Sequence, residues 1–247
     1  MFELKNISKS FGKLCVLNSI SLKIKSGIVT GIIGPNGSGK TSLINIMSGV
    51  YPIDSGQILF DGKEITGAKS DQIYRLGVSR TFQHIRIFKR MTVIENVISA
   101  MISHEPFSFI ELFGQVKSSK GHKVKVAQNL LEIMELENDS KLLAGELPLP
   151  KLRRLEIARA LARDPKVVLL DEPAGGMTPK ETESIVQLIR KNVAPGRTCL
   201  VIEHKMELIA EVCKELCVLN NGQKIVQGDP SAVFNHPEVI DTYLGKV

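Results

Sequence analysis

The sequence predicts an α/β protein whose core is a largely parallel β-sheet with helices on its faces. Strand-like apolar runs alternate with helical patterns in the last third of the chain, and helical periodicity dominates the middle. In the first third, an apolar run leads through a glycine-rich loop into a helix. Alternating strands and helices are typical of parallel sheets. We therefore interpret the helical middle as an insertion into an α/β core.

The first third predicts short strands and one helix. Apolar and β-branched residues, which favour strands, gather near residues 4–7, 22–24 and 28–33. A further strand over residues 57–60 ends in Asp61-Gly62, a turn signal. The helix after the glycine-rich loop carries Leu43, Ile44, Ile46 and Met47. We expect an antiparallel β piece near the N-terminus.

The middle and the last third predict the insertion and the rest of the core. The middle contains an apolar helical stripe made by Val124, Ala127, Leu130, Leu131 and Met134. After it we predict strands over 167–170 and 198–202, helices over 181–190 and 206–212, two more strands and a helical tail. We expect one domain over residues 1–247, with a core of about 1–90 and 164–247 and a helical insertion of about 91–163.

The net charge of the chain is positive but carries little information. Lys and Arg number 32 against 26 Asp and Glu, which gives a formal charge of +6. A basic protein can bind nucleic acid or an anionic membrane surface. Here the basic residues are spread along the chain and mixed with acids, so we interpret them as a solvated surface. We expect no nucleic-acid partner.

The four cysteines, Cys15, Cys199, Cys213 and Cys217, do not form a metal-ligand pattern. We expect them to be buried, reduced thiols of a cytosolic protein. The N-terminal segment MFELKNISKSFGK lacks the apolar core of a signal peptide. No apolar run approaches the roughly 20 residues that span a bilayer. If the protein serves a membrane process, we expect it to act from outside the bilayer.

The glycine-rich loop reads GPNGSGKT and matches the phosphate-binding pattern G-x-x-x-x-G-K-[ST] between a strand and a helix. Its glycines let the backbone curl so that several N–H groups point at phosphate oxygens, and the helix adds its positive dipole end. The lysine supplies charge for the β- and γ-phosphates, and the threonine offers a hydroxyl to Mg²⁺. The predicted nucleotide-binding residues here are Gly34, Pro35, Asn36, Gly37, Ser38, Gly39, Lys40, Thr41 and Ser42.

Two carboxylates follow the apolar strand of residues 167–170. Nucleotide hydrolysis requires a metal ion and a positioned water molecule. Asp171, at the end of the strand, is predicted to reach the Mg²⁺ beside the phosphate loop. Glu172 is predicted to orient or deprotonate the attacking water as the catalytic base. An Asp-Glu pair alone often marks only a strand end. Together with the phosphate loop, this pair indicates a site of nucleotide hydrolysis.

With these motifs in order, the sequence resembles the nucleotide-binding domains of ABC transporters over nearly the whole chain. Phe11 resembles the aromatic residue that stacks on adenine. Gln83, in RTFQ, resembles the glutamine that touches Mg²⁺ and water, and His204, in VIEH, the histidine that contacts the γ-phosphate. The resemblance implies a P-loop ATPase fold that binds ATP and Mg²⁺. It implies metal ligation by Thr41, Gln83 and Asp171, and catalysis by Glu172, His204, Gln83 and Lys40.

The resemblance extends to the ATPases of branched-chain amino acid importers. It rests on LGVSRTFQ at 76–83, RRLEIARAL at 153–161, DEPA at 171–174 and YLG at 243–245. Importers of that type generally use two different ATPase subunits, two different membrane proteins and an external binding protein. The resemblance therefore implies transmembrane permease subunits, a second ATPase subunit, and an indirect external substrate-binding protein. It also implies a peripheral position at the cytoplasmic face of the inner membrane.

Other interpretations stay open at this point. Urea or amide importers and the lipopolysaccharide exporter ATPase share many of these features. Soluble ABC ATPases of DNA repair or translation usually add coiled coils, zinc modules or a second cassette, and none is visible in this sequence. A non-hydrolysing regulatory cassette is a further alternative. Departures from the family pattern suggest it.

The clearest departure replaces the family's LSGGQ motif, which contacts the γ-phosphate bound to the opposite subunit. Here the aligned residues 147–151 read LPLPK. Pro148 removes the serine hydroxyl and Pro150 removes a backbone N–H, whereas Lys151 would compensate in part with its charge. Gly176-Met177-Thr178 also stands where an aspartate-ending turn is common. We therefore expect a heterodimer with one competent site, at Lys40, although a homodimer is possible.

A last expectation concerns the contact with the membrane protein. In the family, the region after the glutamine forms part of a groove for a short helix of that protein. Residues 86–91 supply basic side chains for its rim, and an apolar group follows at Phe107, Phe109, Ile110, Leu112 and Phe113. Packing of the helical insertion against itself is the alternative explanation of these apolar residues.

Overall fold

The computed structural model describes residues 1–101 and 117–244. These described residues divide into two compact units, one within residues 1–83 and 166–247 and the other within residues 84–165. The second unit contains the segment predicted as an insertion and extends a few residues beyond it at each end. Outside the described residues lie Gly245 and the apolar group predicted at Phe107, Phe109, Ile110, Leu112 and Phe113.

The first unit contains a six-stranded sheet with the strand order β10-β9-β3-β8-β7-β6. Neighbouring strands are parallel, except that β10 is antiparallel to β9. The strands are β3 Val29–Ile33, β6 Val78–Arg80, β7 Val167–Asp171, β8 Thr198–Ile202, β9 Glu215–Asn220 and β10 Gln223–Gly228. Every residue of β3, β7 and β8 is buried, which explains their continuous apolar sequence.

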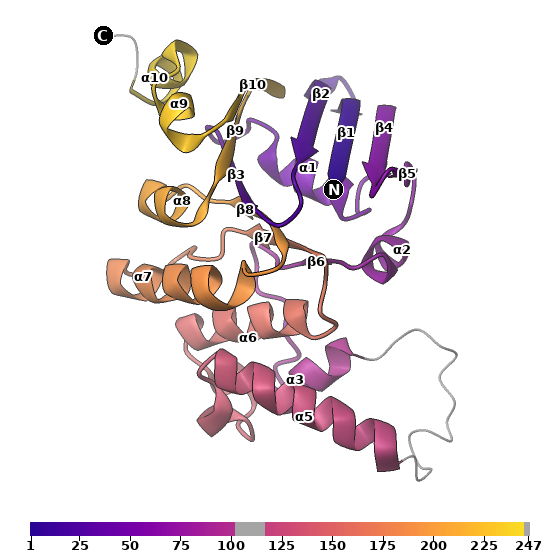
Figure 1. The fold of residues 1–247 in the computed structure, drawn as a ribbon, viewed down its shortest axis with the longest axis vertical. Helices are drawn as coiled ribbons and strands as arrows, with labels where there is room; N and C mark the ends of the chain where they lie inside the picture. The colour runs from indigo at the N-terminus through magenta and orange to yellow at the C-terminus, as the bar shows by residue number, and fades with distance from the viewer. Residues whose placement is uncertain (102–116, 245–247) are drawn as a thin grey trace. The chain divides into compact units, whose positions relative to one another are not determined.

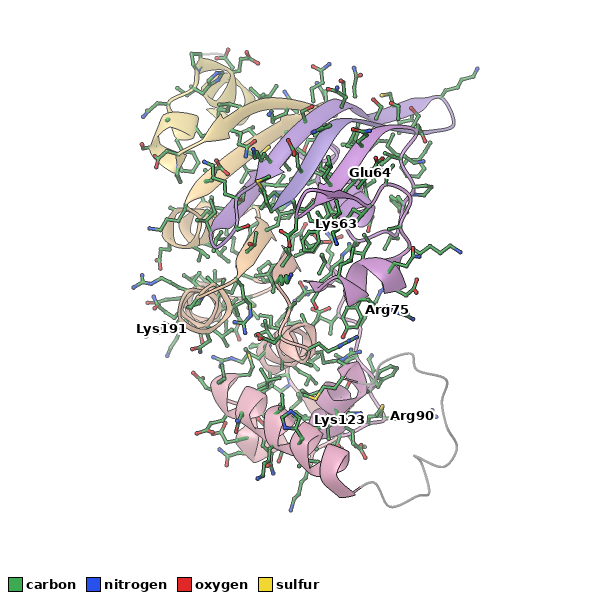
Figure 2. All side chains as sticks on the ribbon, turned by 45° about the vertical axis from the view of Figure 1, so that its right-hand side comes forward. Lys63, Glu64, Arg75, Arg90, Lys123 and Lys191 are labelled. Atoms are coloured by element: carbon green, nitrogen blue, oxygen red, sulfur yellow. The ribbon has the colours of Figure 1, made fainter. Side chains whose placement is uncertain are left out.

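The same unit contains an antiparallel sheet with the order β2-β1-β4-β5. Its strands are β1 Phe2–Phe11, β2 Leu14–Ile24, β4 Ser55–Phe60 and β5 Lys63–Glu64. Figure 2 labels Lys63 and Glu64 on the edge strand, and both are exposed. Charged residues on an edge strand disfavour pairing with another chain. The predicted antiparallel piece near the N-terminus is therefore present.

Helices cover both faces of the parallel sheet. Helix α1, Lys40–Met47, belongs to one buried cluster with side chains of both sheets, including Ile32 of β3. A Cβ atom on the neighbouring Gly31 would meet Ile209 of α8, Met206–Val212. Because successive strand residues point to opposite faces, α1 and α8 lie on opposite sides of the sheet (Figure 1). The predicted α/β fold is confirmed.

The remaining elements of this unit are short helices. They are α2 Ser70–Arg75, α7 Pro179–Leu188, the π-helical turn η3 Ile189–Val193, α9 Pro230–Phe234 and α10 Pro237–Leu244. The helix predicted from Glu181 begins at Pro179, because the Thr178 hydroxyl accepts a hydrogen bond from the Glu181 N–H and the Glu181 carboxylate bonds back to Thr178. Thr178, noted above as a departure from the family pattern, thus caps α7.

The second unit is helical in its described part. It contains α3 Val93–Ala100, α5 Lys117–Ile133, the short 3₁₀ turns η1 Glu137–Asp139 and η2 Ala144–Glu146, and α6 Leu149–Leu161. Of the predicted apolar stripe, Ala127, Leu131 and Met134 are fully buried. In the segment predicted as a groove rim, Phe88 is 51% exposed and the Arg159 guanidinium lies 5.0 Å from its ring centre.

Three of the four cysteines are buried in the first unit, and Cys15 is exposed. Burial raises the pKa of Cys199, Cys213 and Cys217 to about 12, so these thiols stay protonated at neutral pH. No helix of residues 1–101 and 117–244 has both the length and the apolar character needed to cross a membrane.

Candidate functional site

The phosphate loop connects β3 to α1 and depends on glycine at its last turn. Gly37 and Gly39 have φ angles of 80° and 102°, which favour glycine. A Cβ atom on Gly39 would lie 2.6 Å from a methyl carbon of Leu17 and 2.9 Å from the carbonyl oxygen of Val16. Gly39 is also the residue that precedes the first turn of α1. Strand β2 therefore packs against the loop where only glycine fits.

A turn from the far edge of the sheet supports the same loop. Gly222, between β9 and β10, donates its N–H to the carbonyl oxygen of Ser38 at 3.2 Å. Its own carbonyl oxygen accepts the N–H of Asn18 at 2.8 Å. Gly222 of the β9–β10 turn thus links the phosphate loop to β2 through two backbone hydrogen bonds.

Lys40 is the buried cation of the site. Its side-chain Nζ donates to the carbonyl oxygens of Gly34 at 2.8 Å and Pro35 at 2.9 Å. Burial lowers the pKa of Lys40, and the negative charges of Glu172 and Asp171 partly offset this effect by raising it. The lysine therefore bonds to the loop backbone and feels the charges of two carboxylates. The phosphates of a nucleotide would add further negative charge around its ammonium.

The two predicted carboxylates occupy different environments at the end of β7. Asp171 is 1% exposed, and its Oδ2 lies 3.1 Å from Nη2 of Arg80. Glu172 has a φ of 49°, a left-handed conformation that costs a non-glycine residue about 1–3 kcal/mol. The Glu172 N–H donates to the carbonyl oxygen of Ile202 in β8 at 2.9 Å. The backbone thus turns sharply between the two residues.

Glu172 brings together two further predicted residues. Its Oε1 accepts a hydrogen bond from Nε2 of Gln83 at 3.1 Å and lies 3.4 Å from Nε2 of His204. Gln83 follows β6, Glu172 follows β7 and His204 follows β8. These strands are parallel, so their carboxyl ends meet at one edge of the sheet.

These residues line one hollow with a volume of about 200 Å³. Its lining consists of Val16, Asn36, Gly37, Ser38, Gly39, Lys40, Thr41, Ser42, Gln83, Glu172 and His204. Of the predicted site residues, only Phe11, Gly34, Pro35 and Asp171 are absent from this lining. Val16 was missed, because a valine in a strand carries no signal of a binding role.

Phe11 lies at the end of β1 and is 45% exposed. Its ring stands edge-on to Tyr51, with 5.2 Å between the ring centres, and Nζ of Lys9 lies 5.4 Å from the Phe11 ring centre. An exposed aromatic face of this kind can accept a flat heterocycle. Its placement relative to a bound nucleotide stays a prediction.

The donors in the hollow fit a phosphate chain with Mg²⁺. The Ser38 hydroxyl is buried and has no hydrogen-bond partner among the described residues, so a ligand oxygen can satisfy it. The described part of the chain contains no cluster of three or more His, Cys, Asp or Glu side chains that would hold a metal by themselves. Mg²⁺ typically binds through one or two carboxylates plus substrate phosphates. The hollow offers the Thr41 hydroxyl and the Gln83 amide beside the phosphate loop, and the predicted carboxylate ligand, Asp171, lies buried outside its lining.

Sequence patterns gave no role to the two residues beside His204. Glu203 is 3% exposed and accepts the backbone N–H groups of Ala174, His204 and Lys205 at 2.9, 3.0 and 3.3 Å. The ammonium of Lys205 donates to the Met177 carbonyl oxygen at 2.9 Å. Together they tie the loop after β8 to the loop after β7, and so hold His204 and Glu172 in place. The role of Glu203 and Lys205 can be seen only from these tertiary contacts.

Comparisons with known proteins agree with this geometry. The family model described as ABC transporter matches residues 17–175. The chain belongs to the ABC transporter family. The predicted resemblance to this family is confirmed.

The relatives of this ABC transporter chain match over its full length. The high-affinity branched-chain amino acid transport ATP-binding protein BraF of Pseudomonas aeruginosa is 37% identical, covering 100% of this chain and 98% of that protein. The corresponding protein LivG of Escherichia coli is 34% identical, with the same coverage of 100% and 98%. A solved nucleotide-free ATP-binding cassette from an ABC transporter has a TM-score of 0.86 at 33% identity, covering 100% of this chain and 99% of that chain.

The departure from the LSGGQ motif lies in the second unit of the ABC transporter chain. Pro148 is the residue before α6 and Pro150 lies in its first turn, where proline fits a helix but leaves fewer N–H donors. The ammonium of Lys151 donates to both carboxylate oxygens of Asp139, at 2.9 and 2.7 Å. Its charge is therefore balanced locally, which weakens the expected compensation by Lys151.

Gly39→Ala should distort the phosphate loop of this ABC transporter chain. The added methyl group meets Leu17 and the Val16 carbonyl, and about 1.4 kcal/mol of distortion corresponds to tenfold in affinity. We expect ATP affinity, measured by calorimetry, to fall about tenfold or more.

The matched control is Gly62→Ala in the turn after β4. Gly62 has a similar positive φ of 79°, but a Cβ atom there meets nothing within 4 Å. Its affinity for ATP should stay at the wild-type value. Equal affinities in the Gly39 and Gly62 variants would contradict the steric account of the loop.

Proposed function

We propose that this chain is the ATP-hydrolysing subunit of a branched-chain amino acid transporter, with its ATPase site at the phosphate loop. One observation carries the proposal: Lys40, Gln83, Glu172 and His204 line a single hollow around that loop. The full-length relatives named as branched-chain amino acid transport ATP-binding proteins support the cargo class over urea, amides or lipopolysaccharide. The second unit then serves as the helical subdomain of a single ATPase domain.

In this proposal, the loop binds the triphosphate and a metal ion. Lys40 and several backbone N–H groups of the phosphate loop bind the β- and γ-phosphates. Thr41, Gln83 and Asp171 hold Mg²⁺, which when bound neutralises phosphate charge. Phe11 stacks on the adenine ring.

Hydrolysis follows from the carboxylate at Glu172. Glu172 accepts a proton from a water molecule whose oxygen attacks the γ-phosphorus in line with the bond to the bridging oxygen. That bond breaks, and ADP and phosphate form. Lys40 and the loop amides stabilise charge on the phosphoryl oxygens, and His204 donates to the γ-phosphate. Gln83, which already contacts Glu172, fixes the position of the water.

The partners and the location follow from the same proposal. The chain acts with transmembrane permease subunits, a second ATPase subunit and, indirectly, an external substrate-binding protein. It is then a peripheral subunit at the cytoplasmic face of the inner membrane. Binding of two ATP molecules closes the pair of ATPase subunits, and hydrolysis reopens it.

The two ATP sites of that pair are unequal in this proposal. Each ATP lies between one subunit's phosphate loop and the other subunit's LSGGQ motif. This chain has a complete phosphate loop site, whereas Pro148 and Pro150 remove donors from what it offers the partner, and Lys151 is engaged by Asp139. The competent site is therefore the one at Lys40 of this chain, completed by an intact motif of a different partner.

Glu172→Gln should abolish hydrolysis while ATP binding persists. The amide keeps the shape of the side chain but cannot accept the proton, and the loss of a general base typically costs about 10²- to 10⁴-fold in rate. Phosphate release and ATP affinity are measured on the assembled transporter. Glu183→Gln, at an exposed position of α7, is the matched control and should behave as wild type. Unchanged turnover in Glu172→Gln would instead favour a non-hydrolysing regulatory cassette.

The isolated chain should hydrolyse ATP slowly, and addition of the second ATPase subunit should raise the rate, because the site at Lys40 needs the partner's motif. In the mixed complex, Glu172→Gln in this chain should remove most of the turnover. Rates are measured over a range of chain concentrations. Vigorous, cooperative hydrolysis by this chain alone would overturn the unequal pair and favour a homodimer.

A further inference from the structure

We propose that Arg80 is a positioning residue that fixes Asp171 relative to α1, and so sets the spacing of the two Mg²⁺ ligands Asp171 and Thr41. This inference rests on the proposed roles of these ligands. Arg80 ends β6, three residues before Gln83. Its side chain is only 9% exposed. Arginine side chains are mostly exposed and are rarely buried unless they are paired.

The guanidinium of Arg80 joins two elements that carry metal ligands. Its Nη2 lies 3.1 Å from Oδ2 of Asp171, at the end of β7. Its Nη1 donates to Oδ1 of Asn45 at 2.6 Å and to Oγ of Ser48 at 2.9 Å, both on or next to α1. One planar group therefore bridges β7 and α1.

The positions on α1 connect this bridge to Thr41. Residues three and four apart lie on one face of a helix, so Thr41, Asn45 and Ser48 share a face. Asn45 and Ser48 are each 9% exposed. A hydrogen bond to Asn45 therefore holds the helix face that presents the Thr41 hydroxyl one turn earlier.

Arg80 is also held by the two residues that follow it. Its Nε donates to the Thr81 carbonyl oxygen at 3.3 Å, and its guanidinium carbon lies 4.8 Å from the Phe82 ring centre. The Thr81 hydroxyl in turn accepts the Asp171 N–H at 3.1 Å. Arg80 thus contacts the carboxylate of Asp171 and Thr81 its backbone N–H, just before the chain reaches Gln83.

The chemistry requires arginine in particular. A buried carboxylate is costly unless it is paired, but a buried ion pair by itself adds little stability. A lysine ammonium would pair with Asp171 without the planar fork that bonds Asn45 and Ser48 at the same time. Two explanations can therefore be separated: Arg80 either neutralises Asp171, for which any cation suffices, or positions it, for which the fork is needed.

The test compares ATP affinity by calorimetry at saturating Mg²⁺ and in EDTA, for wild type, Arg80→Gln and Arg80→Lys. Loss of a residue that orients a metal ligand typically costs about 10–100-fold in metal affinity. We expect the gain in ATP affinity due to Mg²⁺ to shrink about 10–100-fold in both variants. Affinity in EDTA should stay within about threefold of wild type, since the phosphate loop is unchanged.

The matched control is Arg75→Gln on α2. Arg75, labelled beside α2 in Figure 2, is 58% exposed, and its Nη2 lies 3.9 Å from Oδ2 of Asp71. The Arg75→Gln substitution removes the same charge from the same unit. It should leave the ATP affinity unchanged both with Mg²⁺ and in EDTA. Asn45→Ala removes one of the two Nη1 bonds, keeps the bond to Ser48 and the contact with Asp171, and should reproduce part of the effect. It tests the positioning role if the Arg80 variants do not fold.

Several outcomes would overturn the positioning role. Wild-type Mg²⁺ dependence in Arg80→Lys would assign only neutralisation to Arg80, as would tighter Mg²⁺ binding in Arg80→Gln. An equal loss with and without Mg²⁺ would show a general structural role. Asp171→Asn distinguishes failure of the Arg80 role from failure of the proposed metal site. If this variant keeps the wild-type Mg²⁺ dependence, the proposed metal site itself is wrong.

Discussion

The rest of the site depends on the burial of one ammonium group, that of Lys40. A cation removed from water needs anions or carbonyl oxygens around it. The structure supplies the Gly34 and Pro35 carbonyls at 2.8 and 2.9 Å, and the charges of Asp171 and Glu172 raise a pKa that burial lowers. Such a lysine favours a polyanion in the adjoining hollow. The glycines of the loop then matter because they place backbone N–H groups around the same hollow.

The register of the parallel sheet decides what else can reach this lysine. Strand β8 pairs with both β3 and β7, and β7 pairs with β6. The residues that follow these strands are therefore the phosphate loop, Glu172, Gln83 and His204, all at the carboxyl edge of one sheet. Buried polar side chains then fix each of them. Glu203 ties the loop of His204 to the loop after Glu172, and Arg80 ties Asp171 to α1.

The parts of the site that were predictable from the sequence are those encoded in local order. The phosphate loop and the Asp171-Glu172 pair each follow an apolar strand, so pattern and position together identify them. His204 also follows an apolar strand, but it was predicted only from the resemblance to the family. The roles of Arg80 and Glu203 depend on contacts 91 and 29 residues away along the chain. No local sequence pattern predicts contacts between residues so far apart along the chain. For Lys151, local order was misleading. As the last residue of the altered motif it was expected to compensate with its charge, but in the fold its ammonium pairs with Asp139.

The most direct test of the account is ATP binding measured by calorimetry in wild type, Lys40→Ala and Lys191→Ala. Lys191, exposed on η3 and labelled in Figure 2, is a control for loss of a lysine charge. The account predicts that the Lys191 variant binds ATP as wild type does and that the folded Lys40 variant loses about tenfold or more in affinity. Undiminished ATP binding by folded Lys40→Ala, or no ATP binding by well-folded wild type, would contradict it.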